Sequence, residues 1–402
     1  TATPTPTPVM PTATPTPTPV MPTATATPRP TSTPTPRPTA TPTPTPLAYP
    51  PVPYVGPVAK CEDKGTHIYC VSSTLPLPPE TIPAWTSNRN GYSPEVFCSS
   101  DYPVDACGWH LEALEVAFSY MGHRNLTEYW VMGHGIEARD QLSTVMCDRH
   151  VAKGHQTQEQ CEEKNTNPGS YGLETYRAES EKSITSGETS NSAGWNGSRW
   201  WGINWYESSI AQGFLSPDNY PDYPFECPDR CSAGVEAQKT MFHEAFHGAQ
   251  SSYLATDDFQ KRDDLKGPKW WREGSAEFIA QAYVDKARKA GTLRVINADR
   301  TIRATDPETG AVIDKKNAQG QIIGAELVTR EYEFKDNMRK KLFEYFKNRE
   351  HTCVGQNLGQ YKNCSHMEYD AGSWGVAYLN HKVGGFDWQA FYSDLEALGW
   401  EA

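Results

Sequence analysis

The spacing of apolar residues changes several times along the chain, and each change predicts a different kind of element. Residues 110–120 repeat apolar side chains at helical intervals, and the run that follows, residues 128–133, favours a strand. An aromatic run at residues 199–206 predicts a second strand, and from Val235 the pattern is mainly helical. A polar stretch at residues 291–328, with Glu-Thr-Gly and Ala-Gln-Gly turn signals, predicts a hairpin or two.

Other parts of the chain carry weaker apolar periodicity. Residues 331–349 and 372–398 predict further helices near the end of the chain. Residues 147–167 are polar and predict a surface segment that a disulfide closes. Residues 180–197 are rich in Ser, Thr, Asn and Gly and predict a loop. A helix that feeds a strand, followed by a mainly helical half, indicates an α+β fold.

The first fifty residues are almost entirely Thr, Pro and Ala, and they contain an eleven-residue repeat, residues 1–11 and again 12–22. Such a segment cannot bury a core, and alternating proline favours extended polyproline-like backbone. We therefore interpret residues 1–50 as a disordered linker that tethers the rest to a cell wall or a second module. Residues 51–207 are expected to form an α/β part with disulfides, and residues 208–402 the remaining core with a mainly helical C-terminal subdomain.

Charge and hydropathy exclude two classes of partner. The 402-residue chain carries a formal net charge of −12 and shows no basic stripe, so we expect no nucleic-acid partner. No run approaches the roughly 18 consecutive apolar residues that a membrane-spanning helix requires. We therefore expect no transmembrane segment.

The ten cysteines fall into neighbours along the chain, which indicates an oxidising compartment. The simplest pairing is Cys61–Cys70, Cys98–Cys107, Cys147–Cys161, Cys227–Cys231 and Cys353–Cys364, although spacing alone does not establish connectivity. Free thiols in a cytosolic protein are the alternative, and a cysteine metal site lacks a second close pair. Because the first residue is Thr, we interpret the chain as a fragment or processed product of a secreted or cell-surface protein.

One motif indicates a metal-binding site. His243 and His247 stand four residues apart in a predicted helix, with Glu244 between them. Residues four apart share a helix face, so both imidazoles can reach one ion while Glu244 lies beside it. The alternative is an ordinary amphipathic helix with surface histidines. A catalytic zinc ion needs a third protein ligand and one open position for water.

The third ligand is suggested by the sequence downstream. Glu273 lies 26 residues after His247, within the run Trp-Trp-Arg-Glu-Gly-Ser-Ala-Glu. This HExxH followed by EGxAE resembles the gluzincin zinc metallopeptidases, including their collagenase-like and thermolysin-like members. The resemblance implies a zincin-like catalytic domain with His243, His247 and Glu273 as zinc ligands. It also implies that Glu277 supports a ligand histidine from behind. The alternatives are that Glu273 is a carboxylate near a helix start and Glu277 is solvated.

The same resemblance implies a mechanism. Glu244 would act as general base on a zinc-activated water, and a Tyr or His would donate to the developing oxyanion. Tyr369 is the first candidate for this donor, His366 the second, and Tyr361 a third. An extended protein or peptide substrate would add as a strand to a sheet edge, which we place at residues 200–205.

We therefore expect a secreted zinc peptidase, and in the absence of an aminopeptidase signature, an endopeptidase. The main alternative is a metal-binding or inactive pseudopeptidase that serves as a binding module at the cell envelope. A zinc hydrolase acting on another amide and a purely structural wall protein are the remaining alternatives.

Overall fold

Fold and site are taken from a computed structural model, which describes fifteen stretches of the chain. These are residues 53–78, 92–122, 126–133, 135–154, 157–161, 193–197, 201–206, 234–254, 256, 258–296, 299–303, 313–317, 319–325, 327–331 and 365–397. All of them belong to one compact unit, Pro50–Ala402. The predicted linker at residues 1–50 lies outside the described residues, as does the helix predicted over residues 331–349 apart from Glu331, which ends a strand.

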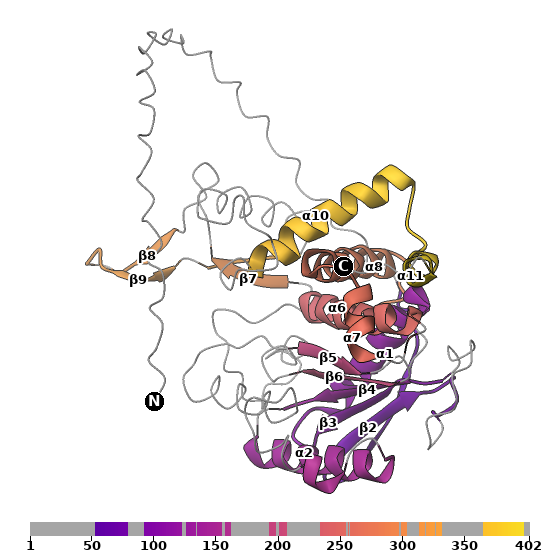
Figure 1. The fold of residues 1–402 in the computed structure, drawn as a ribbon. Coiled ribbons are helices and arrows are strands. Elements are labelled where there is room, and N and C mark those ends of the chain that lie inside the picture. Colours follow the sequence, from indigo (N-terminus) through magenta and orange to yellow (C-terminus); the bar gives the residue numbers. More distant parts are fainter. Residues whose placement is uncertain are drawn as a thin grey trace, which may run out of the picture. The chain divides into compact units, whose positions relative to one another are not determined.

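The described residues combine a mixed β-sheet with helices, so the fold is α+β (Figure 1). The sheet has the order β1-β2-β3-β4-β6-β5. β3 and β4 pair in parallel, as do β4 and β6, whereas the other neighbours pair antiparallel. The strands are β1 Ala59–Asp63, β2 His67–Ser72, β3 Glu95–Ser99, β4 Leu126–Val131, β5 Ala193–Gly197 and β6 Trp201–Tyr206.

Both faces of the sheet are covered, which explains why β3 and β4 are buried at every position. Successive side chains of a strand point to opposite faces. On β4, Tyr129 and Val131 join the larger core with α1 (Val104–Met121), while Trp130 joins a smaller core with Leu142 and Met146 of α2 (Ile136–Ala152). The sheet is therefore packed between α1 and α2.

Two long helices continue the larger core beyond α1. α6 spans Gly234–Tyr253 and α8 spans Lys269–Lys289, and the short helix α7, Phe259–Leu265, precedes α8. The side chains by which α6 enters the core recur at helical spacing: Val235, Met241, Phe242, Ala245, Phe246 and Ala249. α6 packs against α1, β5 and α8, and so it lies between the sheet and the helical part of the unit (Figure 1).

Two helices near the end of the chain complete this helical part. α10 spans Ser365–Val383 and α11 spans Trp388–Ala397. α10 crosses α8 at a point where both carry glycine, since a Cβ added at Gly274 or Gly372 would overlap the backbone of the other helix. The two backbones are thus in direct contact, which only glycine permits.

The polar stretch at residues 291–328 contains short strands, as its turn signals predicted. β8 (Asp314–Lys316) and β9 (Ile322–Ala325) form an antiparallel hairpin. β7 (Asp299–Arg303) pairs antiparallel with β10 (Leu327–Glu331). The predicted helix at residues 110–120 is confirmed within α1, and the strands predicted at 128–133 and 199–206 are confirmed as β4 and β6.

Three cysteine pairs lie at disulfide distance: Cys61–Cys70, Cys98–Cys107 and Cys147–Cys161. They link β1 to β2, β3 to α1, and α2 to the segment that follows it. They are three of the five predicted pairs, while Cys227–Cys231 and Cys353–Cys364 lie outside the described residues. No helix in the described ranges is long and apolar enough to cross a bilayer.

Three expectations are corrected by the structure. Residues 136–152 form α2, so the polar stretch from residue 147 begins inside a helix. Residues 193–197 form β5, although their Gly- and Asn-rich sequence predicted a loop, because they pair with β6. Among the described strands the edge of the sheet on this side is β5, whereas residues 201–206 lie between β4 and β5. The substrate edge predicted at residues 200–205 is therefore wrong.

Candidate metal centre

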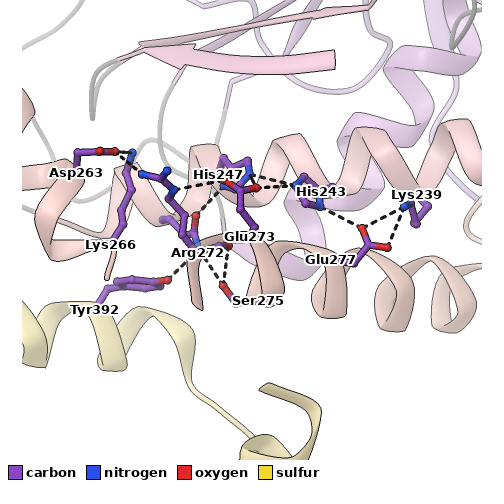
Figure 2. Close-up of polar contacts among 11 residues, drawn as sticks. Lys239, His243, His247, Asp263, Lys266, Arg272, Glu273, Ser275, Glu277 and Tyr392 are labelled. Atoms are coloured by element: carbon purple, nitrogen blue, oxygen red, sulfur yellow. Dashed lines mark hydrogen bonds and ion pairs between the residues drawn. The ribbon is translucent and has the colours of Figure 1, made fainter. Parts of the chain in front are cut away.

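Two imidazoles meet on one face of α6. His243 and His247 stand on successive turns, and their rings lie edge to face with centroids 4.8 Å apart (Figure 2). Their Nε2 atoms are separated by 3.1 Å. This juxtaposition follows from helical geometry, because side chains four residues apart project from the same face.

A carboxylate from α8 closes the group. Glu273 Oε2 lies 3.1 Å from His247 Nε2 and 3.4 Å from His243 Nε2. His243 and Glu273 are buried, and His247 is nearly so. Within the described ranges these three residues form the one group of three or more His, Cys, Asp or Glu side chains that could hold a metal ion, and their ligand atoms lie within 4.8 Å of one another.

The three atoms have the spacing that a tetrahedral zinc ion requires. Bonds of about 2.0–2.1 Å at tetrahedral angles place neighbouring ligand atoms about 3.3 Å apart. The observed separations are 3.1 Å between the imidazole nitrogens, and 3.1 Å and 3.4 Å from these nitrogens to the carboxylate oxygen. Two imidazoles with one carboxylate favour zinc over magnesium or calcium, which prefer oxygen ligands alone. The residues therefore fit a zinc ion with a fourth position left open.

The outer nitrogen of His243 faces a carboxylate. Its Nδ1 lies 3.3 Å from Glu277 Oε2, as the sequence led us to expect for a supporting group (Figure 2). Lys239 Nζ contacts both oxygens of Glu277, at 3.0 Å and 3.1 Å, and the Gln281 amide donates to Glu277 Oε1 at 2.6 Å. Because Lys239 balances its charge, Glu277 can stay ionised in a buried place and accept the Nδ1 proton.

The outer nitrogen of His247 faces an amide instead. Its Nδ1 lies 2.9 Å from Gln250 Oε1. Each imidazole thus has an acceptor behind it, so that in its neutral form the proton sits on Nδ1 and the Nε2 lone pair is directed inward. Two lone pairs and a carboxylate oxygen at such short range repel one another, and a cation between them removes this repulsion.

The second oxygen of Glu273 is directed away from the histidines. Glu273 Oε1 lies 3.4 Å from Arg272 Nε, and Arg272 NH1 donates to Asp263 Oδ1 at 2.9 Å (Figure 2). The two oxygens of Glu273 therefore have different partners: Oε2 faces the two histidines, and Oε1 faces the Arg272 guanidinium. This division suits binding of a metal through one oxygen.

Burial and charge set the protonation of the group. Burial lowers the pKa of His243, but its contacts with Glu273 and Glu277 outweigh this and raise the pKa to about 9. Burial raises the pKa of Glu273, and the stronger attraction of His247 and His243 holds that pKa well below its usual range. The carboxylates thus attract positive charge to the site. A bound metal would take the place of a proton, since ligand imidazoles must be neutral.

Glu244 lies on the same helix between the two histidines and is 8% exposed. Burial raises the pKa of its carboxyl, against the opposing attraction of His247 and His243. A carboxylate whose pKa is moved toward neutrality is suited to accept a proton at physiological pH.

The candidates for the oxyanion donor come from α10. The Tyr369 ring lies against the His243 ring, with centroids 5.7 Å apart and planes inclined by 30°. Tyr369 stands one turn before Gly372, where α10 touches α8, so the close crossing of the helices brings it to the site. His366 lies in the first turn of α10, and the structure describes its backbone only. Tyr361 lies outside the described residues.

Four residues around the group were missed from the sequence: Gln250, Lys239, Gln281 and Arg272. Helical spacing held a signal for three of them, since Gln250 is three residues after His247, Lys239 four before His243, and Gln281 four after Glu277. The role of Arg272 depends on α7, through Asp263, and spacing along one helix could not indicate it.

Comparison of the chain with protein-family models, with curated proteins and with solved structures gives no significant match.

Proposed function

We propose that the chain is a zinc-dependent peptidase of the gluzincin type, with His243, His247 and Glu273 as zinc ligands. The observation that carries this proposal is the set of three inward-facing atoms at the separations of a tetrahedral site. The acceptors behind both imidazoles support it, because they orient the ligands for a cation.

A zinc ion in this place supplies Lewis acidity, polarising a carbonyl oxygen and lowering the pKa of water to about 7. Glu244 would accept a proton at its carboxylate from the attacking water and would deliver it to the leaving amine. Burial of Glu244 supports this role, because it lessens the preference of the carboxyl for its ionised form.

Tyr369 is the group we propose for the oxyanion. Its ring lies against the His243 ring, which places this residue beside the proposed zinc site. A hydroxyl directed to the developing negative charge stabilises the transition state. His366, on the same helix, is the second candidate.

We propose β5 as the strand along which an extended peptide substrate binds. β5 is an edge of the sheet and packs against α6, the helix that carries both histidines and Glu244. An extended peptide can add to such an edge through main-chain hydrogen bonds, which gives affinity with little dependence on sequence. This supports an endopeptidase.

The cysteine pairs support an extracytoplasmic location, since disulfides persist in oxidising compartments. We propose that the protein is secreted or held at the cell surface. Residues 1–50 would then serve as a tether to a cell wall or second module.

The test is elemental analysis of wild type and of Glu273→Ala, with cleavage of unfolded casein measured alongside. We expect about one zinc per chain in the wild type, and loss of most zinc and all cleavage in the variant, because two imidazoles alone hold zinc poorly. Glu137→Ala, at an exposed position of α2, is the control. Zinc without cleavage would favour the pseudopeptidase. A wild type that binds no zinc after reconstitution would refute the proposal.

A further inference from the structure

The amide of Gln250 makes more directed contacts than an ordinary buried glutamine. The residue is fully buried on α6, one turn beyond His247. Its Oε1 lies 2.9 Å from His247 Nδ1. Three oxygens lie within hydrogen-bond distance of its Nε2 and share its two N–H groups: the Arg272 carbonyl at 3.2 Å, Ser275 Oγ at 3.0 Å and the Tyr392 hydroxyl at 2.9 Å.

The orientation of this amide is forced by one of its partners. A backbone carbonyl can only accept, so the end of the amide that faces Arg272 must be the NH₂ group. Ser275 Oγ donates to the same carbonyl at 3.1 Å, and its lone pairs are thereby left to the amide of Gln250. The oxygen of the amide must then face His247, where it can only accept.

The orientation of the amide in turn fixes the histidine. Since Gln250 Oε1 accepts, the proton of a neutral His247 sits on Nδ1, and the lone pair sits on Nε2, which faces His243 and Glu273. The Arg272 carbonyl therefore selects the imidazole tautomer that can bind a metal, through one intervening side chain.

One of the anchors comes from α11. Tyr392 is fully buried, and its hydroxyl is joined to Gln250, 142 residues away along the chain. Its ring also stacks on Tyr253, at the end of α6, with centroids 6.2 Å apart. The chain of contacts from α11 to His247 is thus Tyr392, Gln250 and the Nδ1 atom, all buried or nearly so (Figure 2 shows Tyr392 and His247).

We infer that Gln250 is the positioning residue of His247, and that Tyr392 makes the metal affinity of the centre depend on α11. The inference rests on the proposed function, because it concerns the zinc ion that His247 would hold. It gives α11 a part in the site although no residue of α11 is proposed as a ligand. The support differs between the two histidines: His243 has a charged acceptor, and His247 a neutral one.

The first measurement is zinc affinity of the full chain, by competition with a chromophoric chelator. Gln250→Met keeps the size of the side chain and removes its acceptor, and we expect about 10- to 100-fold weaker zinc binding. Tyr392→Phe removes one anchor of three and should weaken binding about fivefold, as the loss of one net hydrogen bond implies.

Two matched controls separate positioning from general packing. Gln238→Met also removes a buried amide from α6, one that donates to the Arg294 carbonyl at 2.7 Å. Tyr253→Phe removes the hydroxyl of the tyrosine that stacks on Tyr392, which donates to the Met121 carbonyl. Both controls are expected to lower thermal stability while leaving zinc affinity within about twofold, because neither contacts a ligand.

The second measurement is proton NMR of the Co²⁺-loaded protein, in which a ligand imidazole gives a strongly shifted, exchangeable Nδ1–H signal. We expect two such signals in the wild type, and in Gln250→Met one of them should exchange faster with solvent. A structural role alone would not change a single imidazole proton. If Gln250→Met does not fold, Tyr392→Phe decides the question with the same two measurements.

The outcomes separate the two proposals. Wild-type zinc binding with unchanged affinity and unchanged Nδ1–H exchange in both variants would overturn the inference and leave the proposed function standing. A wild type without zinc would refute the proposed function and the inference with it. Weakened affinity in the two variants and not in the two controls is the result we expect.

Discussion

Two buried groups of histidine and glutamate occur among the residues that the structure describes, and they differ in how their polar atoms are partnered. One lies between the sheet and α2, where Glu128 contacts His150 Nε2 at 2.9 Å, Arg149 Nε at 2.7 Å and Lys153 Nζ at 3.2 Å. The other is the group of His243, His247 and Glu273. Glu128 and Glu273 are both almost fully buried, so exposure does not distinguish them.

The direction of the contacts does distinguish them. Each oxygen of Glu128 faces a donor or a cation of the protein itself, and neighbouring Glu95 is met by the Tyr69 hydroxyl at 2.7 Å and by Arg149. At the second group, Glu273 Oε2 faces the Nε2 atoms of two imidazoles, and the Nδ1 atom of each imidazole faces an acceptor on the far side. Cations of the chain balance the first group, whereas the second has ligand atoms at the spacing that a metal ion could use. This contrast separates an ion pair that stabilises the fold from a candidate metal centre.

The largest effect that we predict is the loss of peptidase activity in Glu244→Gln, which tests the group of His243, His247 and Glu273. We expect casein cleavage to fall by roughly 10²- to 10⁴-fold, because the general base is removed, while the zinc content stays unchanged. Thermal stability should not fall, since a buried carboxyl is replaced by a neutral amide of the same shape.

The control for this variant is Glu236→Gln, which makes the same change in the first turn of α6. It should leave both zinc content and cleavage as in the wild type. Wild-type turnover in Glu244→Gln would contradict the proposed mechanism.

The next largest effect concerns the balanced group. Glu128→Ala leaves His150 without its carboxylate and Arg149 with Glu95 alone, and breaking a buried ion pair in this way costs about 3–5 kcal/mol of the free energy of unfolding. Urea denaturation measures this loss, and zinc affinity should stay unchanged. A variant that lost zinc but kept its stability would reverse the roles that we assign to the two groups.

The sequence predicted those features that depend on spacing within one element. The i, i+4 pair of His243 and His247 is fixed once the helix is known, and Glu277 lies one turn after Glu273 on α8. α1 and β4 were predicted because their apolar periodicity reflects simple burial. In each case the information is local.

What could not be predicted depends on partners far along the chain. α2 carries Arg139 and His150 on its buried side, so its apolar pattern is weak, and its polar residues are accommodated by groups such as Glu128 on β4. β5 consists of Ala, Gly, Trp and Asn, and is a strand because β6 lies beside it. Gln250 owes its role to Tyr392, a contact between distant parts of the chain.

The smallest effect that we predict is the acid sensitivity of the balanced group. Burial raises the pKa of Glu128, but hydrogen bonding and attraction from His150, Arg149 and Lys153 outweigh it and hold that pKa well below its usual range. A carboxyl with a depressed folded-state pKa contributes stability that is complete above its unfolded pKa of about 4.3 and is lost as the pH falls below it.

We therefore expect the free energy of unfolding of the chelator-treated wild type to fall between about pH 5 and pH 2, and to fall less in Glu128→Gln, which has no proton to gain there. Chelator treatment removes the contribution of zinc release, which acid also promotes because protons compete for the ligand histidines. Urea denaturation at pH 7 and pH 3 gives the comparison. An equal loss in both proteins would mean that the acid sensitivity resides in other carboxylates, and that Arg149 and Lys153 do not stabilise the ionised form of Glu128 as the geometry indicates.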